Sequence, residues 1–133
     1  MKVLAIGSNI TIKKICENII DKVDSLNLVD FTNKNYLNWD LSTSNKIKYN
    51  TGDIKKIDTL IKAGLEDSEV IIVHSKNDID TLFIAQKSKI DTEKSVFVVL
   101  EDLLLAEVYE SLGFIIIDSH NLKITKLINK IGN

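Results

Sequence analysis

Short apolar runs alternate along this chain with longer stretches in which apolar residues recur at every third or fourth position. The runs are Lys2–Ile6, Leu26–Val29, Lys46–Tyr49, Val70–Val73, Val96–Leu100 and Phe114–Ile117. Runs that are apolar on both faces are typical of buried parallel strands, and the intervening spacing predicts helices. Strands that alternate with helices form right-handed βαβ units. The sequence therefore predicts an α/β fold, a three-layer, doubly wound domain with a mainly parallel sheet of about six strands.

Five stretches carry the helical spacing, and they cover residues 12–23, 54–61, 79–90, 104–112 and 121–131. Gly64 and Gly113 are placed to end two of these helices, and Asn121 is placed to cap the last one. The segment Asn33–Asn45 is rich in Asn, Ser, Thr and Asp, which favour caps and turns, so a short or irregular helix is expected there. Trp39 within it is expected to cover the edge of the sheet; the alternative is an exposed anchor for a partner.

Length and composition restrict the class of protein. A chain of 133 residues with 44% hydrophobic and 27% charged residues fits one globular domain, spanning residues 1–133. The net charge is −2, so no clustered basic surface for nucleic acid is expected. The chain has no arginine, the residue that most often clamps phosphate. The apolar start MKVLAIG is too short for a signal sequence or a membrane span, and a cytoplasmic protein without direct membrane insertion is expected.

Candidate binding residues follow the predicted strands, because ligands of doubly wound sheets bind beyond the carboxyl ends of the strands. Asp30 comes about twenty residues after Gly7, the position from which a carboxylate binds the ribose hydroxyls of an adenosine. The alternative for Asp30 is a solvated turn. The predicted cofactor-binding residues are Gly7, Ser8, Asn9, Ile10, Thr11, Asp30, Gly52, Asp53, His74 and Ser75.

No catalytic or metal-binding residue is predicted. His74 and His120 fall on the same edge, but two histidines are too few for a catalytic zinc site. The pair Glu101-Asp102 could do acid–base work, yet two carboxylates after a strand more often begin a helix. Cys16 is expected to be a small apolar residue on a buried helix face rather than a reactive thiol.

Two stretches resemble a known family. Thr51–Gln86, TGDIKKIDTLIKAGLEDSEVIIVHSKNDIDTLFIAQ, is similar to a stretch of TrkA-N domains, also called RCK N-terminal domains, which regulate potassium transport. In that stretch a strand ends in Gly-Asp, and a helix leads to Ala-Gly followed by a hydrophobic residue and Glu-Asp. Leu100–His120 resembles the next unit of the family, in which a helix ends in Leu-Gly. With MKVLAIG and the pair Val29-Asp30, the likeness covers nearly the whole chain.

The resemblance implies a Rossmann-like domain that binds NAD(H), ATP or ADP. It also implies a regulator rather than an enzyme, one that forms a homodimer or a higher homo-oligomer and acts on the membrane subunit of a potassium channel or transporter. Such a domain would lie at the inner face of the membrane. In the family the helix that matches residues 121–131 crosses to a partner subunit.

The departures from the family fall mainly on the ligand site. The glycine-rich loop of the family keeps its first glycine as Gly7, but its second and third glycines are Asn9 and Ile12. The second glycine lets the backbone approach a pyrophosphate, and the third lets helix and strand pack closely. Asn9 is expected to keep the turn by tolerating positive φ, and Ile12 is expected to displace the helix. Lys13 or Lys14 could supply part of the lost positive charge.

Further family positions differ after the fourth and fifth strands, where Ile79, Thr81 and Val99 replace Glu, Asn and Arg. We therefore expect weakened or altered adenine-nucleotide binding, with NAD(H) or ATP/ADP bound weakly or not at all. Two alternatives stay open: the same fold with a lapsed site that acts through dimerisation and partner binding, or a small NAD(P)-dependent oxidoreductase. The second is disfavoured because no catalytic constellation is visible.

Overall fold

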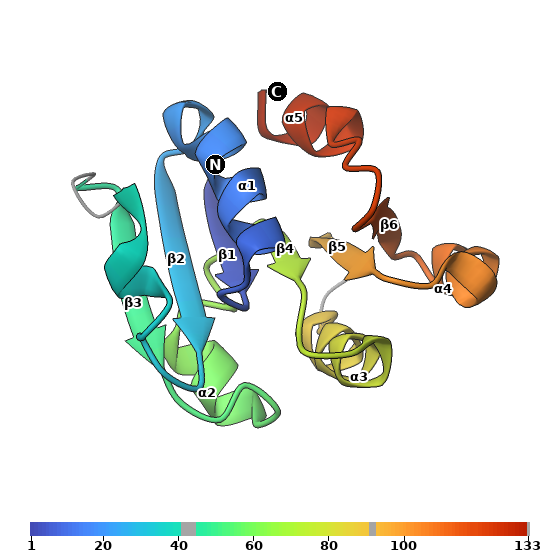
Figure 1. The fold of residues 1–133 in the computed structure, drawn as a ribbon, viewed down its shortest axis with the longest axis horizontal. Helices are drawn as coiled ribbons and strands as arrows, with labels where there is room; N and C mark the ends of the chain where they lie inside the picture. The colour runs from blue at the N-terminus through green and yellow to red at the C-terminus, as the bar shows by residue number, and fades with distance from the viewer. Residues whose placement is uncertain (41–44, 91–92, 133) are drawn as a thin grey trace.

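The structure, a computed structural model, describes residues 1–40, 45–90 and 93–132. Its centre is a six-stranded sheet in the order β3-β2-β1-β4-β5-β6, and each pair of neighbouring strands is parallel (Figure 1). The strands are β1 (Lys2–Ile6), β2 (Ser25–Asp30), β3 (Ile47–Thr51), β4 (Val70–Val73), β5 (Ser95–Leu100) and β6 (Ile115–Asp118). This arrangement confirms the predicted doubly wound α/β fold, whose strand order reverses direction between β1 and β4.

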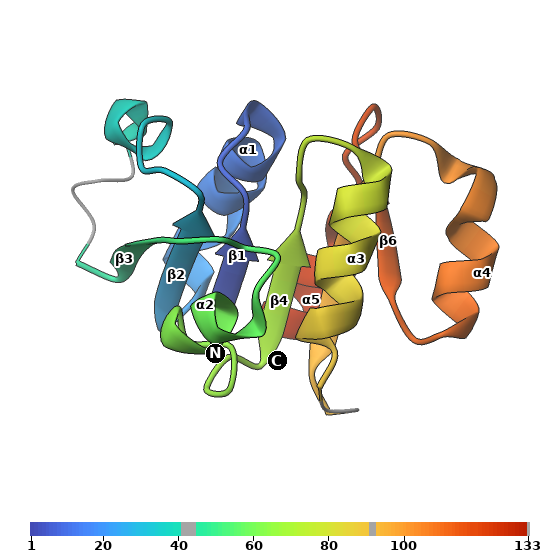
Figure 2. The same cartoon turned by 90° about the horizontal axis from the view of Figure 1, so that it is seen from below.

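Helices cover both faces of the sheet. They are α1 (Ile10–Ile19), η1 (Ile20–Lys22), η2 (Tyr36–Asn38), α2 (Ile57–Lys62), α3 (Asp78–Ser88), η4 (Leu103–Leu105), α4 (Ala106–Ser111) and α5 (Thr125–Gly132). Alternate residues of β1 separate two cores: Val3 and Ala5 pack with α1, η2 and α5, whereas Leu4 and Ile6 pack with α2 and α3. Figure 2 shows α2 and α3 in front of the sheet, α1 behind it and α4 beside β6 at the right-hand edge.

The last helix begins later than the sequence suggests. Asn121 does not cap α5, because it pairs with Asp118 in an isolated antiparallel bridge and the helix starts only at Thr125. The apolar side of α5 lies on its own domain, with Leu127 and Ile131 buried in the core on the α1 face. That this helix crosses to a partner subunit stays a prediction.

In the described part of the polar segment after β2, Tyr36–Asn38 form a short helical turn, η2, as the composition of the segment predicts. Trp39 is only 4% exposed and meets Tyr36 edge to face, with ring centroids 4.9 Å apart. Tyr36 in turn lies 5.3 Å from the ring of Tyr49 on β3. Trp39 is therefore part of the cover over this end of the sheet, not an exposed anchor. Residues 41–44 of the predicted segment lie outside the described residues.

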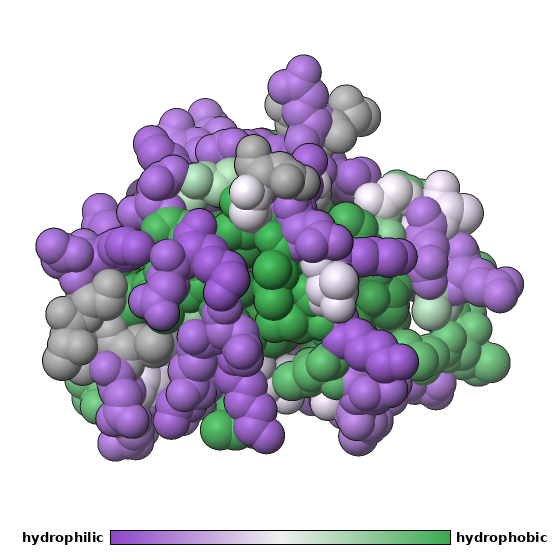
Figure 3. Space-filling model, turned by 90° about the horizontal axis from the view of Figure 1, so that it is seen from above, coloured by the Kyte–Doolittle hydropathy of each residue, from purple (hydrophilic) through white to green (hydrophobic). Residues whose placement is uncertain are grey.

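The apolar stripe of α3 faces the core only in part, through Leu82 and Ala85, and that of the η4–α4 region meets it through Tyr109. Thr81 and Ser88 are buried on α3, whereas Ile79 is 81% exposed and Phe83 is also exposed. All three leucines of η4 are exposed, together with Val108 and Leu112. We call Ile79, Phe83, Leu104, Val108 and Leu112 the α3–α4 apolar face. Figure 3 shows apolar surface at the right-hand end of its view, the side on which α4 lies in Figure 1.

Candidate functional site

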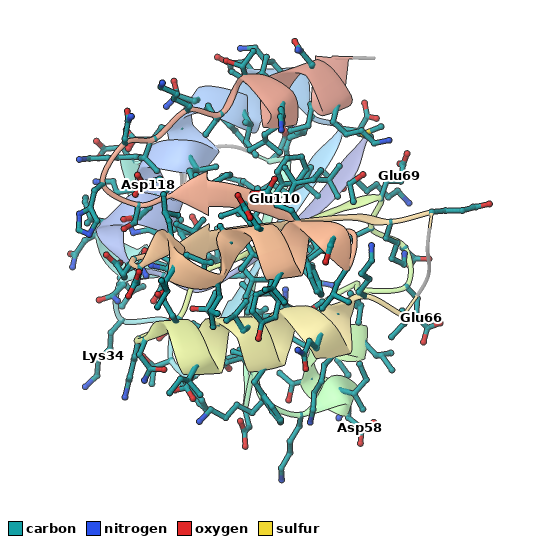
Figure 4. All side chains as sticks on the ribbon, turned by 90° about the vertical axis from the view of Figure 1, so that its right-hand side faces the viewer. Lys34, Asp58, Glu66, Glu69, Glu110 and Asp118 are labelled. Carbon is teal, nitrogen blue, oxygen red and sulfur yellow. The ribbon has the colours of Figure 1, made fainter. Side chains whose placement is uncertain are left out.

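The carboxyl ends of the strands bring polar residues together at one edge of the sheet. Figure 4 places Asp118, from the end of β6, on this edge, with Glu66 and Glu69 on the opposite edge. Two cavities of about 180 Å³ and 260 Å³ lie beside the loop between β1 and α1. They share Ser8, Asn9 and Asn35 as lining residues, and we call them together the loop cleft.

Gly7 forms the turn from β1 into this loop. Its φ is +122°, and a Cβ at this position would lie 2.1 Å from the backbone carbonyl oxygen of His74. The Gly7 N–H donates to the Val29 carbonyl over 2.9 Å, and the His74 N–H donates to the Ile6 carbonyl over 3.0 Å. A side chain cannot be accommodated where the loop passes the end of β4, so Gly7 is required by the fold itself.

Asn9 acts differently from expectation, and Ile12 is part of the core. Asn9 has a φ of −76° and does not use positive φ; it is the N-cap of α1, and its Oδ1 accepts the Ile12 N–H over 3.0 Å. Ile12 is fully buried and extends the core under α1, and its displacement of the helix relative to the family stays a prediction. The second glycine position of the family thus carries a cap, and the third carries a core side chain.

Asp30 lies in the loop cleft, and its carboxylate already has two donors from its own chain. Ser8 Oγ donates to Asp30 Oδ2 over 2.5 Å, and the Phe31 N–H donates to Asp30 Oδ1 over 2.7 Å. Asn35 Nδ2 donates to Ser8 Oγ over 3.0 Å. A second link holds the loop from η2, because the Tyr36 hydroxyl donates to the Gly7 carbonyl over 2.6 Å. A ribose hydroxyl would have to compete with these internal bonds.

His74 is buried between two oxygen acceptors. Its Nδ1 lies 3.1 Å from Asn9 Oδ1, and its Nε2 lies 3.0 Å from Glu101 Oε1. Burial lowers the pKa of His74, and the hydrogen bond and charge of Glu101, with the charge of Asp78, oppose this shift. His74 therefore connects the loop cleft to the loop that follows β5.

Glu101 extends this connection to the loop after β6. Its Oε2 accepts the Ser119 hydroxyl over 2.6 Å and lies 3.1 Å from His120 Nε2. The hydrogen bond from Ser119 lowers the pKa of Glu101, and the interactions with His74 and His120 lower it further. Sequence reasoning assigned Glu101 to a helix start and missed this role. Its only signal was the position after a strand.

Asp78 and Thr81 hold the neighbouring loops. The Asp78 carboxylate accepts the N–H groups of Glu101 and Asp102 over 2.8 Å and 2.9 Å. Thr81 Oγ1 accepts the Ser75 N–H over 2.9 Å and donates to the Asn77 carbonyl over 2.9 Å. Asp78 and Thr81 therefore fix the backbone next to the loop cleft.

The structure gathers some of the predicted binding residues and separates others. Ser8, Asn9, Asp30, His74 and Ser75 line the smaller cavity, Ser8, Asn9 and Ile10 line the larger one, and Gly7 is buried beside the loop. Thr11, Gly52 and Asp53 line neither cavity. Lys13 lines the larger cavity, whereas Lys14 borders a separate hollow beside α5. Nucleotide contacts by these residues stay predictions.

Three further expectations concern the Cys16 thiol, metal binding and membrane insertion. Cys16 is buried on α1, and burial raises the pKa of its thiol. Among the described residues no group of three or more His, Cys, Asp or Glu side chains is placed to hold a metal ion. Across residues 1–40, 45–90 and 93–132 no helix has the length and apolar character needed to span a bilayer.

Neither a family model nor a curated protein matches this sequence. Solved structures do match. The GsuK channel bound to NAD shares 12% identity at a TM-score of 0.69, over 97% of this chain and 22% of that one. The Kef CTD of Shewanella denitrificans in its AMP-bound form shares 17% identity at a TM-score of 0.67, over 99% of this chain and 77% of that one. The GsuK RCK domain shares 16% identity at a TM-score of 0.66, over 99% of this chain and 27% of that one.

Identities this low carry information about the fold alone. The match extends over nearly the whole of the described domain, and this chain spans about a quarter of the GsuK chains. The human SLO3 gating ring gives a further match at a TM-score of 0.58, with 15% identity over 89% of this chain and 24% of that one. The all-parallel sheet, its strand order and these neighbours together show that this chain has an RCK-like fold.

Proposed function

We propose that this chain is a non-catalytic regulatory domain of a potassium channel or potassium uptake system, and that it binds an adenine nucleotide weakly in the loop cleft. The observation that carries the proposal is the loop cleft itself. It lies at the switch point between β1 and β4, where doubly wound sheets bind nucleotides, and Asp30 ends the neighbouring strand. Structural neighbours are described as bound to NAD, ADP and AMP.

Weak binding follows from the internal bonds of the cleft. A nucleotide that used Asp30 and the N-terminus of α1 would displace the bonds from Ser8 to Asp30 and from Ile12 to Asn9. At about 0.5–1.5 kcal/mol for each hydrogen bond, these two bonds cost about 1–3 kcal/mol of binding free energy. That cost raises the dissociation constant by roughly 5- to 150-fold. The chain also offers no arginine for the phosphates.

Calorimetric titration with ATP, ADP, AMP, NAD+ and NADH tests the ligand. We expect a dissociation constant on the order of tens of micromolar to millimolar, because breaking the two internal hydrogen bonds reduces the binding free energy. Asn9→Gly should tighten binding, because it frees the Ile12 N–H and restores the second glycine of the loop. Asn18→Gly on the exposed side of α1 is the matched control and should leave binding unchanged. Equal effects of the two variants would contradict the assignment of the site.

A lapsed site is the second candidate function, and the α3–α4 apolar face favours it. Five apolar side chains exposed on adjoining elements are typical of a surface that binds protein. A thermal shift assay separates the candidates: no shift with millimolar nucleotide would leave association as the remaining role. An oxidoreductase would instead turn over NADH with an added substrate.

We further propose that the domain forms a homo-oligomer through the α3–α4 apolar face and acts from the cytoplasmic side on a membrane subunit. Light scattering at high protein concentration should give a mass above that of a monomer. Leu104→Lys should lower this mass, because Leu104 is 84% exposed on that face. Leu37→Lys is the control, since Leu37 is 74% exposed on η2, on the opposite side of the sheet. A monomer at all concentrations would contradict the proposal.

A further inference from the structure

We propose that His74 is a pH-controlled latch that ties the Asn9 loop to Glu101 and closes when both nitrogens of its ring carry a proton. The latch concerns the free protein, and it does not depend on nucleotide binding. Three side chains form the latch: Asn9 in the loop after β1, His74 in the loop after β4 and Glu101 in the loop after β5.

The Nδ1 contact requires a donor on the ring. Asn9 Oδ1 accepts the Ile12 N–H over 3.0 Å, and this cap identifies the facing atom of Asn9 as the amide oxygen. The same oxygen lies 3.1 Å from His74 Nδ1. An oxygen has no proton to give, so the contact is a hydrogen bond only when Nδ1 is protonated.

The Nε2 contact also requires a donor on the ring. It meets Glu101 Oε1 over 3.0 Å, and the second oxygen of that carboxylate accepts the Ser119 hydroxyl over 2.6 Å. The hydrogen bond from Ser119 lowers the pKa of Glu101, so the carboxylate is ionised at neutral pH and only accepts. A neutral imidazole carries one proton and satisfies one of its two acceptors.

A neutral ring keeps its proton on the Glu101 side, because a hydrogen bond to a carboxylate is stronger than one to an amide oxygen. The lone pair of Nδ1 then faces Asn9 Oδ1, and the two repel. Asn9 then loses its link to His74, while its capping bond to Ile12 and the bonds that hold Ser8 and Gly7 remain. Deprotonation therefore releases Asn9 from His74, and protonation ties the two together.

The charged groups around His74 set where the latch operates. Glu101 follows β5 and Asp78 begins α3, and both favour the protonated ring. Asp30 at the end of β2 and Lys76 on the same loop as His74 line the same cavity, and His120 lies beyond Glu101. Burial opposes the positive ring and lowers the pKa of His74. The latch therefore closes on acidification, below the ordinary range of histidine near about 6.5.

The test is an NMR titration of the isotopically labelled protein without any ligand. It follows the ring nitrogens of His74 and His120 and the backbone amide of Ile12, which reports the Asn9 cap. We expect the chemical shift of the Ile12 amide to change with the same midpoint as that of the His74 ring. The His120→Asn variant should show the same midpoint for the Ile12 amide. An Ile12 amide that does not respond, or that follows His120, would overturn the proposal.

Two conservative variants change the acceptors while they keep the fold. Asn9→Asp retains the cap and adds a negative charge, so it should raise the His74 midpoint by about one pH unit or more. Glu101→Gln lets a neutral ring accept at Nε2 and donate from Nδ1 to Asn9, so the Ile12 amide should no longer follow the His74 titration. An unchanged His74 midpoint in the first variant, or an unchanged Ile12 response in the second, would show that the ring is not shared between these acceptors.

Discussion

Substitution of Gly7 by alanine tests whether this glycine serves the fold or a phosphate. The new Cβ would lie 2.1 Å from the His74 carbonyl oxygen, a backbone atom that cannot rotate away. The backbone would also hold an alanine at a φ of +122°. Strain of this kind costs about 1–3 kcal/mol, and the forced separation of the loop from β4 adds to it. We expect a loss of about 3 kcal/mol or more from a typical stability of about 5–15 kcal/mol.

Urea unfolding followed by circular dichroism measures this loss, and thermal unfolding should show a Tm lowered by roughly 10 °C. Two other glycines separate the contributions. Gly113 has a φ of +95°, but its Cβ would meet only the flexible end of Lys89 at 3.0 Å, so Gly113→Ala should cost about 1–2 kcal/mol. Gly132 has no atom within 4 Å of the added Cβ, and Gly132→Ala should be nearly neutral. A Gly7→Ala protein as stable as the Gly132→Ala protein would refute the reasoning.

Three further measurements test the interior and the acid response. Tyr36→Phe should lower the free energy of unfolding by about 0.5–1.5 kcal/mol, because it removes the hydrogen bond to the Gly7 carbonyl. Tyr49→Phe should be neutral or stabilising, because the buried Tyr49 hydroxyl has no partner among the described residues. Cys16 should react with a thiol reagent only after unfolding, which a colorimetric assay with and without denaturant checks. The lowered pKa of Glu101, caused first by the serine hydroxyl that it binds, stabilises the fold above about pH 4.5. This contribution should vanish as the pH falls through the lower folded pKa, and Glu101→Gln should flatten the acid limb of a stability profile.

The sequence by itself determined the architecture. Lys2–Ile6 and Val70–Val73 form strands with the predicted bounds, because runs that are apolar on both faces fit only the buried interior of a parallel sheet. The connection lengths then permit right-handed crossovers, and these lead to the observed strand order. The same reasoning placed Asp30 and His74 at the correct edge of the sheet, since both follow parallel strands.

Surface and core were harder to separate along the helices. Leu104 and Val108 have the spacing of a buried stripe, yet both are exposed on the α3–α4 apolar face. Spacing reports that one side of a helix is apolar, but it carries no information on whether that side meets its own sheet or another molecule. Asn121 looked like a cap for the same local reason, and its pairing with Asp118 delayed the helix.

The chemistry of the site was decided by the tertiary structure alone. Ser8 and Asp30 are far apart in the chain, as are His74 and Glu101, and each pair meets only because parallel strands end at the same edge. The sequence determined which polar residues reach that edge. Which of them bind one another, and therefore which remain free for a ligand or a proton, depends on distances of about 3 Å that only the packed sheet sets.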